Sequence, residues 1–109
     1  MKDFLNNPDA IKDIVSGIGA CIASNRITVD GQQVGFMYRG RPEFEGDSGW
    51  RFVAGDEDET YMDNHLNSKV YDVNTIANYD EAIVPYLKLK FGIELERIDG
   101  TDEFQQVNA

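Results

Sequence analysis

Cysteine, basic side chains and long apolar stretches are what this sequence has least of. Cys21 is the one cysteine among 109 residues and His65 is the one histidine, so no disulfide can form within the chain and a closed four-ligand zinc site lacks its ligands. No apolar run approaches the roughly 20 residues of a membrane span, and the first residues hold acids and a proline where a secretion signal needs an apolar core. We therefore expect a cytoplasmic protein without a membrane partner.

The shortage of bases gives the chain a strong negative charge. Ten Lys and Arg residues stand against twenty Asp and Glu residues, for a formal net charge of −10 at pH 7. Such a field repels phosphate backbones and anionic lipid headgroups, whereas it speeds association with a basic protein. The composition predicts a basic protein partner and no binding to nucleic acid.

This charge is concentrated in one segment. Residues 43–63 hold eight acids and one base, Arg51, and so supply seven of the ten net negative charges. Because Trp and Tyr contribute strongly to binding at protein interfaces, we add the two such residues next to these acids to the candidate set. The predicted partner-binding residues are Glu43, Glu45, Asp47, Trp50, Asp56, Glu57, Asp58, Glu59, Tyr61 and Asp63, and we predict no catalytic residue, metal ligand or cofactor.

Trp50 and Tyr61 have an alternative place in the fold. Large aromatic side chains of a small domain more often lie in its core than at its surface, and Trp50 alternates with Phe52 along an apolar stretch. Tyr61 follows the acids, where its hydroxyl group can face solvent. The alternation favours the core for Trp50. The sequence alone does not decide between core and surface for either Trp50 or Tyr61.

The apolar content of 41% is sufficient for a core, and we expect one domain over residues 1–109. Apolar residues at helical spacing predict a helix over residues 8–16, within an N-terminal extension of residues 1–18. A tight-turn signal between two short apolar stretches predicts a closing hairpin over residues 93–107.

Short strands separate the expected helices. Residues 34–40 are one of them, with Val34, Phe36 and Tyr38 on one face. Helices that interrupt a mostly antiparallel sheet give an α+β fold, and we expect five to six strands with two to three short helices. The other expected strands are residues 20–24, 50–54 and 70–74, together with the two strands of the closing hairpin.

The chain contains residues for two kinds of catalytic site. Four acids are candidates for a divalent cation site in a metal-dependent hydrolase: Asp56, Glu57, Asp58 and Asp63. Calcium-binding loops need glycine at their sixth position, where this segment has Tyr61, and acids are expected at a helix start in any case.

A thiol nucleophile with a histidine base would require Cys21 and His65, but burial in an apolar strand raises a thiol pKa. We predict a non-enzymatic binding protein, with the hydrolase and a regulatory or self-associating domain as alternatives.

The sequence resembles a known bacterial family in three stretches: CIASNRITVDGQQVGFMYR, DSGWRFVAGDEDETYMDN and VYDVNTIANYDEAIVPYL. This is the Imm33-like immunity-protein family, earlier catalogued as a domain of unknown function. The similarity covers roughly residues 20–87, which we take as the family-like core, and is less clear for residues 1–18 and for the tail after Leu87. The resemblance implies a protein that binds and neutralises a toxin of a polymorphic toxin system, and it carries over no catalytic residue.

Overall fold

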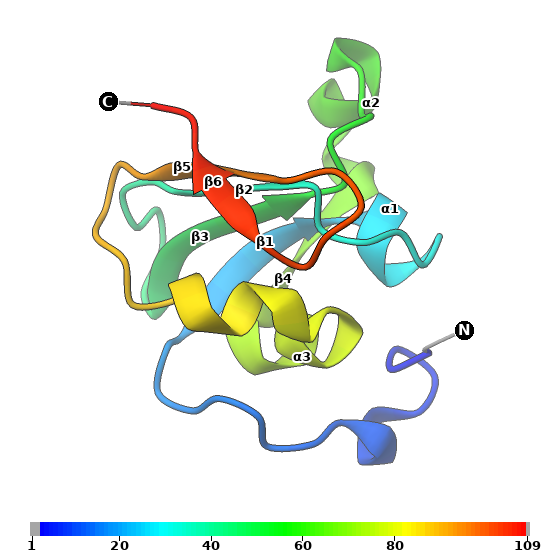
Figure 1. Cartoon of the computed structure of the whole chain (residues 1–109). Helices are drawn as coiled ribbons and strands as arrows, with labels where there is room; N and C mark the ends of the chain where they lie inside the picture. The colour runs from blue at the N-terminus through cyan, green and yellow to red at the C-terminus, as the bar shows by residue number, and fades with distance from the viewer. Residues whose placement is uncertain (1–2, 109) are drawn as a thin grey trace.

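One sheet organises the structure, a computed structural model that describes residues 3–108. Its strands lie in the order β4-β1-β3-β2-β5-β6 (Figure 1). Within the described residues, β1 and β3 are parallel and the other four neighbouring pairs are antiparallel, which confirms the predicted mostly antiparallel sheet. The strands are β1 (Ala20–Ser24), β2 (Phe36–Arg39), β3 (Asp47–Val53), β4 (Ser68–Asp72), β5 (Glu94–Arg97) and β6 (Phe104–Gln106).

Short helices connect these strands and complete the predicted α+β fold. Five of the six described helices begin at a side chain that accepts a hydrogen bond from a backbone N–H of the first turn: Ser24, Asp58, Asn64, Asp72 and Asp80. None of the helices in residues 3–108 is long and apolar enough to cross a bilayer. The helices are η1 (Pro8–Ala10), α1 (Asn25–Thr28), α2 (Glu59–Asp63), η2 (His65–Asn67), α3 (Val73–Tyr79) and η3 (Glu81–Tyr86), where η marks 3₁₀ geometry.

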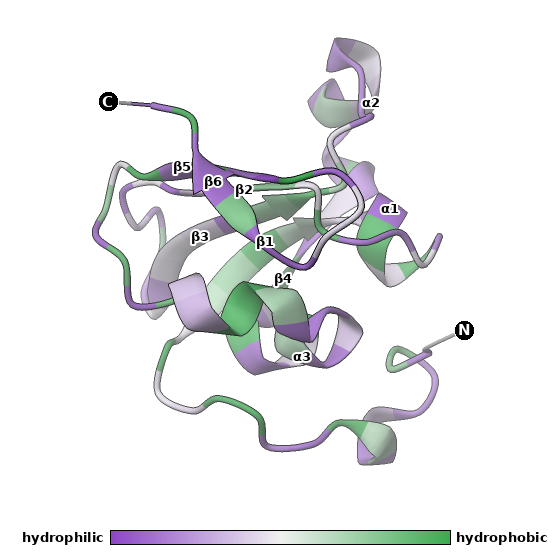
Figure 2. Ribbon diagram, viewed as in Figure 1, coloured by the Kyte–Doolittle hydropathy of each residue, from purple (hydrophilic) through white to green (hydrophobic). Residues whose placement is uncertain are grey.

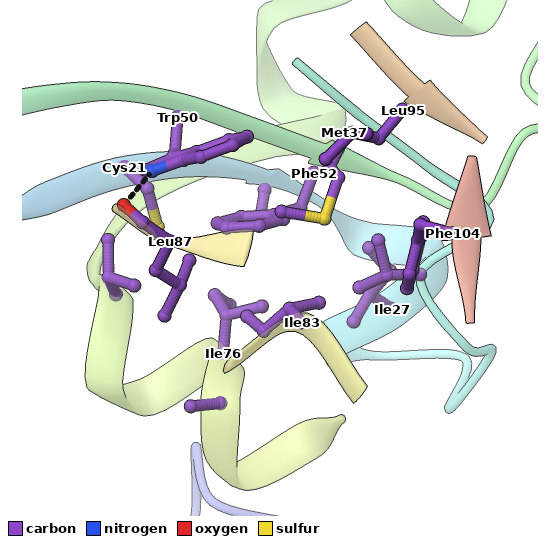
Figure 3. Close-up of a cluster of buried hydrophobic side chains, with 14 of the residues drawn as sticks. Cys21, Ile27, Met37, Trp50, Phe52, Ile76, Ile83, Leu87, Leu95 and Phe104 are labelled. Carbon is purple, nitrogen blue, oxygen red and sulfur yellow. Dashed lines mark hydrogen bonds between the residues drawn. The ribbon is translucent and has the colours of Figure 1, made fainter. Parts of the chain in front are cut away.

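The core lies between one face of the sheet and the pair α3 and η3 (Figure 1). Trp50 and Phe52, which alternate along β3, are wholly buried there with side chains of both helices (Figure 3). The indole Nε1 of Trp50 donates a hydrogen bond of 3.0 Å to the carbonyl oxygen of Leu87, at the end of η3. Trp50 is therefore a core residue, as its alternation with Phe52 favours.

The N-terminal segment differs from the prediction. In place of a helix over residues 8–16, only η1 is helical and the chain from Ile11 to Gly19 is irregular. The backbone of this segment instead bonds to two side-chain amides of α3, those of Asn74 and Asn78. A helix of nine residues is marginal by itself, so the tertiary hydrogen bonds decide the conformation of the segment.

The closing hairpin agrees with the prediction. Strands β5 and β6 are antiparallel, with Leu95 opposite Gln106 and Arg97 opposite Phe104. Leu95 and Phe104 are buried on the core side. Arg97 of β5 fixes the hairpin to the rest of the chain by pairing with Asp80, and it also pairs with Asp102 in the loop between β5 and β6.

Candidate partner-binding surface

The acidic segment does not form one surface. Strand β3 takes up its middle. Seven fully extended residues span about 20 Å, and β3 separates its two ends by somewhat less because Gly49 has a positive φ and the pairing with β1 is irregular there. Glu43 and Glu45 precede β3, whereas Asp56 and the residues of α2 follow its far end, on the other side of the molecule (Figure 1). The predicted contact residues from Glu43 to Asp63 are therefore divided between the two ends of β3.

A single base, Arg51, pairs with two of the three carboxylates of the first acidic group. Arg51 binds both carboxylate oxygens of Asp47, at 2.9 Å and 2.7 Å, and also lies 2.9 Å from a carboxylate oxygen of Glu43. The hydrogen bonds from Arg51, joined by those from the backbone N–H groups of Glu43 and Gly49, hold the pKa of Asp47 well below its ordinary value. Asp47 is buried and paired, so it is a structural residue.

Two predicted contact residues thus lie inside the molecule. The buried carboxylate of Asp47 is paired with Arg51, and Trp50 has no exposed surface because its side chain lies in the core. Neither side chain is available to a partner in the folded protein, which corrects their inclusion in the candidate set. Glu45 remains exposed beside them.

The second acidic group is held in place by α1. Arg26 lies 3.7 Å from a carboxylate oxygen of Asp56, and its guanidinium stacks over the ring of Tyr61 at 4.7 Å. The side-chain amide of Asn25 donates to the carbonyl oxygen of Leu66, just beyond α2. These contacts fix α2 against the end of the sheet. Tyr61 is half-buried under Arg26, so only part of its side chain is accessible to a partner.

Three further acids of this group face solvent, and we call them the α2 acids. Asp58 caps α2 by accepting from the backbone N–H of Tyr61 at 2.7 Å, and Glu59 and Asp63 are exposed on the helix. Among the described residues, no base forms an ion pair with any of the three. Figure 2 shows hydrophilic residues over much of α2.

Glu57 is built into the turn that joins β3 to α2. Its two carboxylate oxygens accept hydrogen bonds of 2.8 Å from the backbone N–H groups of Ala54 and Gly55. Partial burial alone would raise the pKa of Glu57, but hydrogen bonds from the Ser24 hydroxyl and these backbone groups outweigh it and lower the pKa. Glu57 is therefore an ionised carboxylate in a fixed position.

A groove of about 380 Å³ opens between α2 and the sheet face opposite the core. Its floor is a row across three strands, in which Phe36 of β2 lies between Val53 of β3 and Glu96 of β5. Tyr38 lies in the next row, with its ring 5.8 Å from that of Phe36. We call this the acidic groove; it is lined by Gly35, Phe36, Tyr38, Val53, Gly55, Glu57, Met62 and Glu96.

Most of the groove was not among the predicted contact residues. Only Glu57 was, although the alternation of residues 34–40 does place Phe36 and Tyr38 on one face. That face points away from the core, because Met37 between them is the buried residue and Val34 lies in the core ahead of the strand. Glu96 comes from the last hairpin, and only the register of β2 with β5 brings it beside Phe36.

A comparison with known protein families identifies the family of this chain. The family described as the Immunity protein Imm33 domain matches residues 21–108. The chain belongs to the Imm33 family. The match extends past Leu87 to the last hairpin, so the Imm33 region includes every residue of the acidic groove. Searches of curated proteins and of solved structures gave no significant match.

The Imm33 region has its one thiol in the core. Cys21 is wholly buried in β1, and burial raises the pKa of its thiol to about 12, whereas His65 is exposed in η2. A neutral thiol without solvent access is a poor nucleophile. Residues 3–108 also contain no group of three or more His, Cys, Asp and Glu side chains arranged to hold a metal ion.

Proposed function

We propose that this Imm33-family protein is an immunity protein that neutralises a toxin by binding it, without catalysis. The observation that carries the proposal is the uncovered sheet face, where an apolar groove is bordered by ionised and exposed carboxylates. Protein interfaces combine an apolar centre with a polar rim, and this face offers both. The partner we propose is a toxin with a basic surface.

The rim and the floor of this face have separate roles in the proposal. Phe36, Tyr38 and Met62 supply apolar contact area in the groove, which slows dissociation once a partner has docked. The α2 acids stand beside the groove and attract a basic surface from a distance, an effect that salt weakens. The acids before β3 are not part of the proposed surface, because Arg51 pairs with both Asp47 and Glu43.

The first test of the proposal asks whether this protein protects a bacterial host from a toxin. Candidate toxins encoded near the gene are expressed in a bacterial host with and without this protein, and growth is measured. We expect one toxin to be neutralised and to form a stable complex with the purified protein on a sizing column. Failure of every candidate to be either neutralised or bound would refute the proposal.

The role of the α2 acids is tested on the same complex with two variants of equal charge. One carries Asp58→Asn, Glu59→Gln and Asp63→Asn, and it keeps the helix cap because asparagine caps helices as well as aspartate does. The control carries Asp9→Asn, Asp13→Asn and Glu81→Gln, exposed acids of the N-terminal segment and η3. At low salt we expect the association rate constant to fall about tenfold in the first variant and to change little in the control. Equal rates for both variants would assign the effect to net charge alone.

A further inference from the structure

The acidic groove has the chemistry of a receptor for one cationic side chain. Two aromatic rings, Val53 and Met62 give the groove an apolar lining, and Glu57 and Glu96 provide carboxylates within the same lining. None of the lining residues is basic. An arginine or lysine side chain matches this combination, because its alkyl stem is apolar and its head is charged.

The nearby bases do not compete for the two carboxylates. Arg51 lies beside Tyr38 in the next row of the sheet, but Asp47 and Glu43 already bind its guanidinium. Arg97 follows Glu96 and points to the opposite face, where it pairs with Asp80 and Asp102. The negative potential of the groove is thus left for an external cation.

Glu57 is prepared for this role by its surroundings. Backbone N–H groups fix its carboxylate at the end of the groove and keep it ionised, as its lowered pKa shows. A preorganised carboxylate loses little side-chain entropy when it binds a cation. The exposed ring of Tyr38 and the ring of Phe36 add a surface over which a guanidinium can stack.

We propose that the acidic groove binds a single arginine or lysine side chain that projects from the basic surface of the toxin. This inference rests on the proposed function for the source of the side chain, and it assigns the contact that anchors the complex. The hot spots of interfaces are commonly one or a few such residues, among them arginine, set into a pocket.

The groove itself is tested without any toxin. The ¹⁵N-labelled full chain is titrated with N-acetyl-arginine amide, its neutral isostere N-acetyl-citrulline amide and the apolar N-acetyl-norleucine amide, and amide shifts are followed by NMR. We expect saturable shifts for Gly35, Gly55 and Glu96 with the arginine probe, and binding about tenfold weaker or absent with the other two. Equal binding of citrulline or tighter binding of norleucine would overturn the inference, as would shifts of these amides on concentrating the protein alone, which would indicate a second copy in the groove.

Variants locate the site. Glu96→Gln and Tyr38→Leu change exposed side chains of the groove, and we expect each to weaken the arginine probe at least about fivefold. Glu81→Gln and Phe91→Leu, the matched changes outside the groove, should leave its affinity unchanged. If all four variants bind the probe as the wild type does, the groove is not the site.

The toxin complex separates this inference from the proposed function. If the wild type neutralises a toxin and the Glu96→Gln and Tyr38→Leu variants dissociate no faster, the immunity function stands and the anchoring contact is refuted. If no toxin is bound, the function fails, whereas the NMR titration still decides whether the groove takes a cationic side chain.

Discussion

The side-chain amide of Asn78 holds both polar backbone atoms of Lys12. Its Oδ1 accepts from the N–H of Lys12 and its Nδ2 donates to the carbonyl oxygen, each at 2.8 Å. Asn74, one turn earlier in α3, accepts from the N–H groups of Ile14 and Val15. Two asparagines on one helix thus replace the hydrogen bonds that a helix in the N-terminal segment would have made.

The first prediction concerns this attachment. Asn78→Ala should lower the free energy of unfolding by about 1–3 kcal/mol, because it leaves the part-buried N–H of Lys12 without a partner, whereas the carbonyl oxygen of Lys12 still accepts from Asn74. Urea denaturation followed by the fluorescence of Trp50, the single tryptophan, measures the change, and hydrogen exchange at the Lys12 amide should accelerate. The control is Asn6→Ala, since the exposed side chain of Asn6 bonds to nearby Asp3, and its expected effect is below about 0.5 kcal/mol. Equal stability of the two variants would contradict the role of Asn78.

The second prediction concerns the buried charge pair on β3. Arg51→Met should destabilise the protein by about 3 kcal/mol, because the carboxylate of Asp47 then stays buried without its partner. Arg41→Met is the control, since Arg41 is exposed and forms no ion pair within residues 3–108. Chemical denaturation at pH 7 measures the free energy of unfolding of both variants. If Arg51→Met loses as little stability as the control, the charge pair contributes nothing to stability.

The third prediction is a loss of stability in acid. The pKa of Asp47 lies below its ordinary value of 3.8 in the folded protein, so the unfolded chain takes up a proton at a pH where the folded chain does not. The stabilisation from Asp47 is therefore complete well above pH 4 and declines as the pH falls below about 4. Urea midpoints from pH 7 to pH 3 should fall more steeply for the wild type than for Asp47→Asn, and parallel curves would rule out this origin.

The fourth prediction contrasts two glycines of the loop and strand before Trp50. Both have positive φ, +88° at Gly49 and +83° at Gly46, but a Cβ on Gly49 would lie 2.1 Å from the carbonyl oxygen of Gly40, whereas Gly46 has open space. Gly46→Ala should cost about 1–2 kcal/mol for the left-handed conformation alone. Gly49→Ala should cost more, to the point of insoluble expression, because backbone must move. The two variants are compared by their yield of soluble protein and by their melting temperatures. Equal values for both would disprove the close approach of Gly49 to the carbonyl oxygen of Gly40.

The fifth prediction concerns the thiol. Because burial raises the pKa of Cys21 to about 12 and removes its solvent exposure, the folded protein should not react with a disulfide reagent such as DTNB at pH 8. The same chain in concentrated guanidinium chloride should react fully within minutes. Fast reaction of the native protein would place Cys21 at the surface.

Local sequence signals predicted much of the sheet. Alternation of apolar residues identified β1 and the aromatic part of β3, and a tight-turn signal identified the last hairpin, because both signals depend on neighbouring residues only. The helix predicted after Pro8 failed for the opposite reason. Its conformation is decided by Asn74 and Asn78, which lie about sixty residues further along the chain.

The candidate surface was predicted less well, since charge in a sequence is a property of position along the chain and not of position in space. The acids from Glu43 to Asp63 are close together in the sequence, yet β3 divides them. Glu96 is distant in sequence from Phe36, and the register of β2 with β5 makes them neighbours. Strand order and register depend on the whole sheet, so no local pattern predicts the groove.

The order of strands also determines when this fold can form. Strand β1 is synthesised first, but both of its neighbours, β3 and β4, come later in the chain. The N-terminal segment likewise binds to asparagines of α3, which are synthesised later. Pairings between distant parts of a chain form slowly and late. A nascent chain that ends before α3 therefore has neither a completed sheet nor an anchored amino terminus, and folding during translation must await the synthesis of α3.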